Sequence, residues 1–347
     1  MKISFKYILI ICSLLIAGGC HKMDIRLAEP NANLQSAAEF AHNNFAFSLF
    51  YAAIERAGMV DELNGPGPFT ILAPTNAAFN QRGIYNNDDL GKLSPDSLRR
   101  LISRHILNGK HFVEDIPGGT IDNLYYNIEG SKLYFSCNVT MYQGNNYYVN
   151  GVPLTHASGK TDIILSNGLL HETNGLLNNY DGTLAEWLVQ NGQYKIFIAG
   201  LRQFGYWPML SDTSLAWTIF PPSDSVFLSK GVTEAMVSGL DSNAYGKRLF
   251  GVYLFPSRFF LSDLSIASAT YGAVVGDSDW SNGYAFNTSD QGLWYLSKVT
   301  PAGDIIKTNW VQLSLIRYSG VDKDILTWNG TVQKIDQLVL LPGEAAK

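Results

Sequence analysis

The stretch Phe69-Thr70-Ile71-Leu72-Ala73-Pro74-Thr75-Asn76-Ala77-Ala78-Phe79 has a counterpart 148 residues further along the chain. The counterpart reads Trp217-Thr218-Ile219-Phe220-Pro221-Pro222-Ser223-Asp224-Ser225-Val226-Phe227. In each copy a short apolar run ends at proline, which has no N–H for strand pairing and is expected to end a strand. The polar residues that follow favour a turn or the start of a helix. Because the pattern occurs twice, we expect two copies of one structural unit.

Further landmarks recur in the same order in both copies. They are the pairs Gly58/Gly205, Leu101/Leu249, His105/Tyr253 and Asn167-Gly168/Asn329-Gly330. The last pair is separated by 162 residues rather than 148, so the second copy carries about 14 extra residues before it. We place the boundary between the copies near Tyr180-Asp181-Gly182, because this stretch is polar and typical of a turn.

The hydrophobic spacing predicts helices early in each copy and strands later. Apolar residues three or four apart predict a helix over residues 37–57, which Gly58 closes in a left-handed conformation. A second helix is expected over Ser97–Ile106, with Pro95 in its first turn. Strands are predicted over residues 69–73, 133–139, 147–149, 163–165 and 169–171. The fold class is therefore α+β, with the helices grouped in the N-terminal half of each copy.

These landmarks resemble the fasciclin domain, present twice. The segment from Ala57 to Phe79 is similar to the first signature of that family, and Asn167-Gly168-Leu169-Leu170-His171 is similar to the second. The stretch from Asn329 to Pro342 matches the second signature more fully. The resemblance implies two fasciclin-like domains, each a β-sandwich or wedge, over residues 34–180 and 181–343.

The chain departs from the family pattern at several places, one of which is Pro221 in place of the small residue matched by Ala73. Arg104-His105 and Val252-Tyr253 stand where many members carry Tyr-His, a dipeptide that is tied to receptor adhesion in animal members. That specific role is therefore not carried over to this chain. Thr173-Asn174 also stands where the family usually has Ile-Asp.

The N-terminus reads as a targeting segment. Lys2 and Lys6 precede an apolar stretch over residues 7–17, which is too short for an ordinary transmembrane helix. Ala17-Gly18-Gly19-Cys20 resembles the lipobox of bacterial lipoproteins, in which the cysteine is acylated, for example with palmitate. We expect a signal peptide over residues 1–19, lipidation at Cys20 and a lipidated tether over residues 20–33. An ordinary cleaved secretion signal is the alternative.

No arrangement of residues typical of an active site or a metal site stands out. The six histidines lack zinc spacing and all precede the second copy, and there is no nucleophile elbow and no phosphate-binding loop. Asn76 and Asp224 are expected to be structural caps, His105 a buried histidine on a helix face, and Cys137 a buried inert thiol. We therefore predict a non-catalytic protein without cofactor or metal.

The composition gives limits of its own. Apolar residues make up 46% of the 347 residues and charged residues 16%, which excludes a disordered chain. The net charge is −5 and no basic cluster is present, which argues against nucleic acid as a partner.

Aromatic residues are concentrated in the second copy, which holds all seven tryptophans. The stretch Tyr271–Tyr295 interleaves aromatic rings with Gly, Ser, Asn and Asp, a mixture that suits a surface for a protein or a sugar. The candidate contact residues are Tyr271, Trp280, Tyr284 and Trp294. The alternative is that these rings fill the core of a β-hairpin.

Together these features predict a lipid-anchored cell-envelope protein that acts by binding. Its roles would be cell adhesion, matrix attachment or scaffolding of an envelope protein, with an envelope protein, extracellular matrix or glycan as the partner. The combination resembles Bacteroidetes-type lipoproteins, which implies an anchor in the outer membrane and leaves both the periplasmic and the surface face open. The alternative function is glycan capture during polysaccharide uptake.

Overall fold

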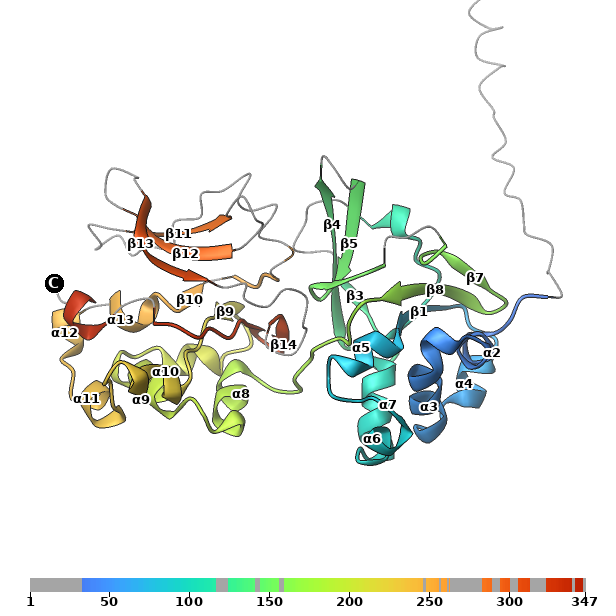
Figure 1. Ribbon diagram of the computed structural model, residues 1–347, viewed down its shortest axis with the longest axis horizontal. Helices are drawn as coiled ribbons and strands as arrows, with labels where there is room; N and C mark the ends of the chain where they lie inside the picture. Colours follow the sequence, from blue (N-terminus) through green and yellow to red (C-terminus); the bar gives the residue numbers. More distant parts are fainter. Residues whose placement is uncertain are drawn as a thin grey trace, which may run out of the picture. The chain divides into compact units, whose positions relative to one another are not determined.

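The computed structural model describes residues 33–116, 124–140, 144–155, 159–245, 248–255, 257–260, 262, 283–288, 294–299, 305–312, 323–338 and 341–345. These residues form an α+β fold in which helices pack on mixed β-sheets (Figure 1). The same arrangement of elements occurs twice. We call elements α2 to β8 the first repeat and elements α8 to β15 the second repeat.

The first repeat has its helices before most of its strands, as the sequence predicts. Its helices are α2 (Ala37–Asn43), η1 (Phe45–Phe47), α3 (Ser48–Arg56), α4 (Val60–Asn64), α5 (Asn76–Asn80), α6 (Asn87–Gly91), α7 (Pro95–Ser103) and η2 (Val113–Asp115). Its strands are β1 (Phe69–Pro74), β2 (Ile106–Asn108), β3 (Leu124–Tyr126), β4 (Lys132–Thr140), β5 (Gly144–Val149), β6 (Val152–Pro153), β7 (Ile163–Leu165) and β8 (Gly168–Thr173). The strands form two sheets, with the orders β2-β1-β8-β7 and β3-β4-β5-β6.

The second repeat has the same central sheet. Its helices are α8 (Leu184–Asn191), α9 (Lys195–Gln203), η3 (Trp207–Leu210), α10 (Asp224–Ser229), α11 (Glu234–Ser238), α12 (Ser242–Tyr245) and α13 (Arg248–Gly251), and α15 (Pro342–Ala345) follows its last strand. Its strands are β9 (Trp217–Ile219), β10 (Leu254–Phe255), β11 (Gly283–Thr288), β12 (Trp294–Val299), β13 (Ile305–Gln312), β14 (Ile325–Thr327) and β15 (Gly330–Val332). The sheet order β10-β9-β15-β14 reproduces β2-β1-β8-β7, and the central pair is parallel in both. Strands β11, β12 and β13 form a further antiparallel sheet.

Both repeats begin with the same helix cap. The Ser36 hydroxyl accepts from the Glu39 amide while the Glu39 carboxylate accepts from the Ser36 amide, and Thr183 and Glu186 form the same pair of bonds. Such a capping box satisfies donors that the first turn of a helix leaves unpaired. The predicted left-handed residue after the early helix is confirmed, since Gly58 has φ +67°.

Two predicted helix boundaries are wrong. The helix predicted over Ser97–Ile106 ends at Ser103, because Ile106 begins β2 and pairs with Ile71 of β1. The helix predicted over residues 37–57 is divided at Asn44, which is extended and caps η1 with its side chain. In both places backbone pairing or capping overrides a helical spacing of apolar residues, which by itself does not define an end.

One buried asparagine in each repeat connects the sheet to the helices. The Oδ1 atom of Asn167 accepts from Ala37 N at 3.0 Å, and its Nδ2 donates to Leu63 O at 2.7 Å and Gly65 O at 2.8 Å. Asn329 repeats all three bonds, with Leu184 N at 2.9 Å, Leu210 O at 2.9 Å and Asp212 O at 3.0 Å. Each amide therefore joins the start of the central strand to a helix N-terminus and to the end of a second helical segment.

The glycine after each asparagine allows the central strands to approach. A Cβ atom added at Gly168 would clash with the carbonyl oxygen of Phe69, and one added at Gly330 would clash with that of Trp217. Asn-Gly is therefore required at this point of the fold, since the asparagine supplies three hydrogen bonds and the glycine leaves room for the neighbouring strand.

Each repeat has a hydrophobic core between its helices and its central sheet, and the first repeat has a second cluster that joins the central sheet to β4 and β5. In the first repeat Phe47, Phe50, Ile54 and Phe79 are buried in the core between helices and sheet, and burial of each such side chain contributes roughly 1.5–3 kcal/mol. In the second repeat the core is more aromatic, with Phe197, Phe220, Phe250 and Tyr253 in the same cluster.

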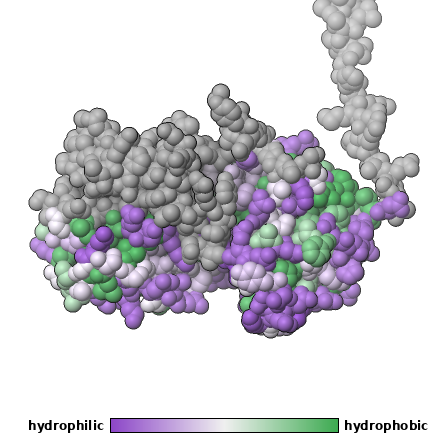
Figure 2. All heavy atoms as spheres, in the orientation of Figure 1, coloured by the Kyte–Doolittle hydropathy of each residue, from purple (hydrophilic) through white to green (hydrophobic). Residues whose placement is uncertain are grey.

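The outer surface of helices α6 and α7 is polar. In Figure 2 hydrophilic residues dominate the surface over α6 and α7, opposite the buried side chains of those helices. In the described part of the chain, no helix combines the length and the apolar character that crossing a bilayer requires.

We expect Asn167→Asp to lower the free energy of unfolding of the first repeat by about 3 kcal/mol, measured by urea denaturation. The aspartate keeps an acceptor for Ala37 N but places oxygen, instead of a donor, against the carbonyls of Leu63 and Gly65. Asn87→Asp on the exposed surface of α6 is the control, with an expected change below about 0.5 kcal/mol. Equal effects of the two substitutions would contradict this account of Asn167.

Candidate functional site

Most of the residues chosen from the sequence as contact or lipidation sites fall outside the described structure. Cys20, Tyr271 and Trp280 lie outside the described residues. Tyr284 lies on β11 opposite Lys298, and Trp294 begins β12 opposite Thr288. The backbone thus places Tyr284 and Trp294 on neighbouring strands of one hairpin. Thr288, the residue that pairs with Trp294, is four positions after Tyr284 on β11.

His105 is fully buried and follows helix α7, rather than lying on its face as predicted. Its Nδ1 bonds Leu101 O at 2.9 Å, and its Nε2 accepts from Leu177 N at 3.1 Å. Burial lowers the pKa of His105 to about 4, so the ring is neutral with its proton on Nδ1. Both ring nitrogens are used in the fold, which leaves none for a ligand.

His171 lies in the middle of β8 and is also used internally. Its Nε2 donates to His111 O at 2.8 Å, and its Nδ1 accepts from Asp162 N at 3.1 Å. Burial lowers the pKa of His171, against the opposing effects of the His111 carbonyl and Asp162. In the second repeat Gln333 takes this place and holds the backbone N–H of Asp324 at 2.9 Å.

The predicted caps Asn76 and Asp224 are structural, and each serves a helix distant in sequence. Asn76 Oδ1 accepts from Leu49 N at 3.0 Å near the start of α3, and Asp224 Oδ1 accepts from Ile196 N at 2.8 Å near the start of α9. The helix that contains Asn76 is capped instead by Thr75. These residues therefore hold helix pairs together and are not placed as ligands.

The remaining thiol and the acidic groups also have structural surroundings. Cys137 is free and buried on β4, and burial raises the pKa of its thiol. Within the described ranges, no three His, Cys, Asp or Glu side chains come together as metal ligands.

The two repeats meet at a junction that hydrogen bonds and rings define. Arg258 of the second repeat bonds the Tyr134 hydroxyl of the first, and its guanidinium lies 4.7 Å from the centre of the Tyr134 ring. Tyr134, Phe260 and Leu326 form a small buried cluster there. The segment between the repeats is paired as well, since Asn178 and Tyr180 exchange backbone bonds with Leu326.

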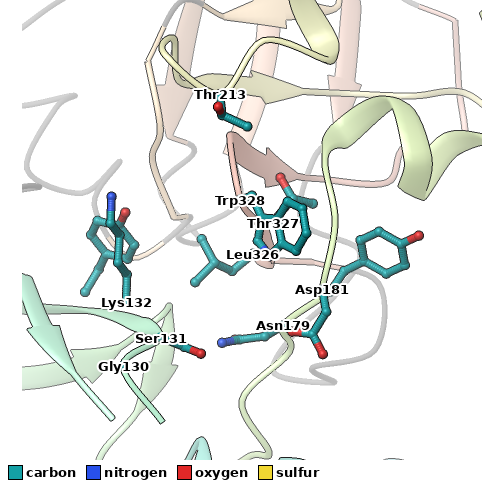
Figure 3. Close-up of a pocket in the computed structure, with 11 residues that line it drawn as sticks. Gly130, Ser131, Lys132, Asn179, Asp181, Thr213, Leu326, Thr327 and Trp328 are labelled. Atoms are coloured by element: carbon teal, nitrogen blue, oxygen red, sulfur yellow. The ribbon is translucent and has the colours of Figure 1, made fainter.

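A pocket of about 490 Å³ opens at this junction. Its lining comes from the β3–β4 turn, the connecting segment, the loop after η3 and the β14–β15 turn. The lining residues are Gly130, Ser131, Lys132, Tyr134, Asn179, Tyr180, Asp181, Thr213, Leu326, Thr327 and Trp328. Figure 3 shows Lys132 and Asp181 on opposite sides, with Leu326 and Trp328 between them.

Trp328 is the prominent aromatic residue of this pocket. Its side chain is 60% exposed although it stands in the turn between two buried strands. Its backbone is fixed on both sides, because its N–H donates to Gly182 O at 2.9 Å and its carbonyl accepts from Arg258 Nη2 at 3.2 Å. The indole is thus exposed on a backbone that is fixed at this turn.

Sequence reasoning missed this pocket. One feature of the sequence does point to it. Trp328 stands directly before the Asn329-Gly330 pair, at a turn where a polar residue is usual, so an exposed aromatic ring could be expected there. The other walls come from segments far apart in sequence, so their meeting was not visible without the fold.

Comparisons with known proteins point to one family. The model of the fasciclin domain family matches residues 45–179. Human periostin is 25% identical over 214 residues, which is 61% of this chain and 22% of periostin. The protein sll1735 of Synechocystis sp. is 33% identical over 100 residues, which is 28% of this chain and 71% of that protein.

One solved structure also shows a weak similarity to this chain. It is a FAS1 domain pair from the insect cell adhesion molecule Fasciclin I, at 17% identity and a TM-score of 0.39. The match covers 87% of this chain and 99% of that chain. In contrast, the chain spans only about a fifth of the length of periostin.

We expect acid to destabilise the protein through His105. The unfolded histidine takes up a proton near pH 6.5, whereas the folded one does so near pH 4, so stability falls as the pH drops between these values. The loss amounts to at most about 3 kcal/mol. Urea unfolding measured from pH 7 to pH 4 should show a smaller loss in His105→Gln than in the unchanged chain. An NMR titration that finds the His105 ring charged at pH 5.5 would refute the assignment.

Proposed function

The chain belongs to the fasciclin domain family, and from this premise we propose that it acts by binding, without catalysis. The role is cell adhesion, matrix attachment or scaffolding of another protein at a cell envelope. The partner is an envelope protein or an extracellular matrix component.

The observation that carries this proposal is the use of the family's landmark polar residues inside the fold. Thr70 Oγ1 donates to Gly109 O at 2.8 Å and accepts from His111 N at 2.9 Å. Thr218 repeats both bonds, with Ser257 O at 2.7 Å and Phe259 N at 3.1 Å. Asn167 and Asn329 are used in the same way. Because these groups stabilise the two repeats, the function falls to the surfaces that the repeats present.

Contacts with the protein partner are assigned in this proposal to Tyr271, Trp280, Tyr284 and Trp294. Aromatic rings provide contact area at low entropic cost, which makes them common anchors of protein interfaces. The backbone of β11 and β12, where two of the four lie, forms a regular hairpin that would hold them in register.

The anchor in this proposal is a lipid on Cys20. The basic start, the short apolar stretch and the small residues before Cys20 support it. Two or three acyl chains hold a protein firmly on a membrane, since each buried CH₂ contributes about 0.8 kcal/mol. The proposed location is the outer membrane.

The binding role is tested by cross-linking on intact cells with the tagged full-length chain, followed by mass spectrometry. We expect a specific protein partner whose yield falls at least fivefold in the Trp280→Ala plus Tyr284→Ala variant, because interface anchors of this kind dominate binding energy. Phe45→Ala, which removes an exposed ring of the first repeat, is the control and should retain the partner. An equal yield from all three chains would remove the support for these contacts.

The anchor is tested by Cys20→Ala. We expect this chain to lose incorporation of labelled palmitate and to move from the membrane fraction to the soluble fraction, because the proposed lipid attachment site is gone. Cys12→Ala, inside the segment proposed to be removed, should leave labelling intact. Labelling that persists in Cys20→Ala would contradict the assignment.

A further inference from the structure

We propose that the pocket at the junction of the two repeats binds a neutral oligosaccharide, with Trp328 as the ring on which a sugar unit stacks. The inference rests on the proposed function in one respect, that the protein acts by binding. It assigns a second ligand class and a second site, separate from the aromatic residues of β11 and β12.

The first argument is the exposed indole. Trp328 keeps 60% of its surface exposed beside a floor formed by the buried residues Leu326 and Thr327. A flat, rigid aromatic ring offers a large apolar area to the C–H face of a sugar at little entropic cost. The backbone bonds to Gly182 and Arg258 fix the Cα atom of Trp328 before any ligand arrives, so that only the side-chain rotations remain to be ordered on binding.

The second argument is the set of polar groups around the ring. Asn179 accepts a bond from Asn150 with its Oδ1, and among the described residues nothing accepts from its Nδ2. Asp181 is bound to Arg104 through Oδ2, at 2.6 Å, and its second carboxylate oxygen has no donor within the described ranges. Hydroxyl groups of a sugar both donate and accept, so a pocket that offers an amide donor and a carboxylate acceptor suits them.

The third argument is the balance of charge. Lys132 has no acidic partner among the described side chains, and it lies on the opposite side of the pocket from Asp181 (Figure 3). Because Asp181 is already paired with Arg104, Lys132 is the one charged group of the lining without a counter-charge among the described side chains, and a single ammonium is not the cluster of cations that an acidic polymer requires. A volume of about 490 Å³ falls within the roughly 300–1,000 Å³ of small-molecule sites, too small for a folded partner.

The test is calorimetric titration of the purified full-length chain with cellotriose, xylotriose, chitotriose and maltotriose. We expect at least one of them to bind with a dissociation constant near or below about 1 mM. Trp328→Ala should weaken that binding at least tenfold and Lys132→Ala several-fold, because both groups contact the sugar in this proposal. Tyr85→Ala removes an equally exposed ring elsewhere in the first repeat and should leave the affinity within twofold. Thermal unfolding confirms that each variant is folded.

Three results would overturn the proposal. The first is no heat of binding with any of the four trisaccharides. The second is binding that Trp328→Ala and Lys132→Ala leave unchanged. The third is binding that is abolished instead by Trp280→Ala plus Tyr284→Ala, which would move the sugar to the β11–β12 hairpin. The cross-linked protein partner does not depend on Trp328, so failure of the pocket and failure of the proposed function give different results.

Discussion

The buried amides of Asn167 and Asn329 are the interactions on which the rest of each repeat depends. Each asparagine lies directly before a central strand, and its side chain bonds three backbone groups that belong to two helical segments. A buried polar side chain that satisfies all its partners specifies one arrangement, because any other arrangement leaves donors and acceptors unpaired. The glycine that follows leaves room for the neighbouring parallel strand, β1 or β9, to form its backbone pairs with the central strand. The position of the sheet relative to the helices is therefore set at one point in each repeat.

Around this shared frame the two repeats have diverged at buried positions. The first repeat places His105 and His171 where the second places Tyr253 and Gln333. Asp162 and Asp324 hold the same left-handed backbone conformation, with φ +55° and +51°, and each donates its N–H to the side chain opposite. The geometry has been kept while the titratable groups have not, so acid acts on the first repeat through its two buried imidazoles and the second repeat lacks that sensitivity.

Much of the fold could be predicted from local patterns, and the pocket could not. Pro74 ends β1 and Gly58 adopts a left-handed conformation because these residue types permit little else. The end of α7 was misplaced because the apolar residues Ile102 and Ile106 fit a helix, whereas pairing of Ile106 with β1 decides its conformation. Trp328 is visible in the sequence as one of seven tryptophans, but Lys132 and Asp181, which line the same pocket, come from segments about 200 and 150 residues away. Contacts of that range are set by the tertiary fold, which residue spacing does not encode.

The parallel pairing at the centre of each sheet also delays completion of the sheet during synthesis. Phe69 must find Gly168, 99 positions later, and Trp217 must find Gly330, 113 positions later. Pairing over such distances is slow, and until it happens β1 and β9 present an unpaired strand edge to other chains. A nascent chain that stops short of Asn167 therefore carries its helices and two strands, β1 and β7, whose shared partner β8 is missing, and such unpaired edges favour aggregation. The strand that completes each repeat is thus made last, and the newly made protein needs protection until the ribosome has passed it.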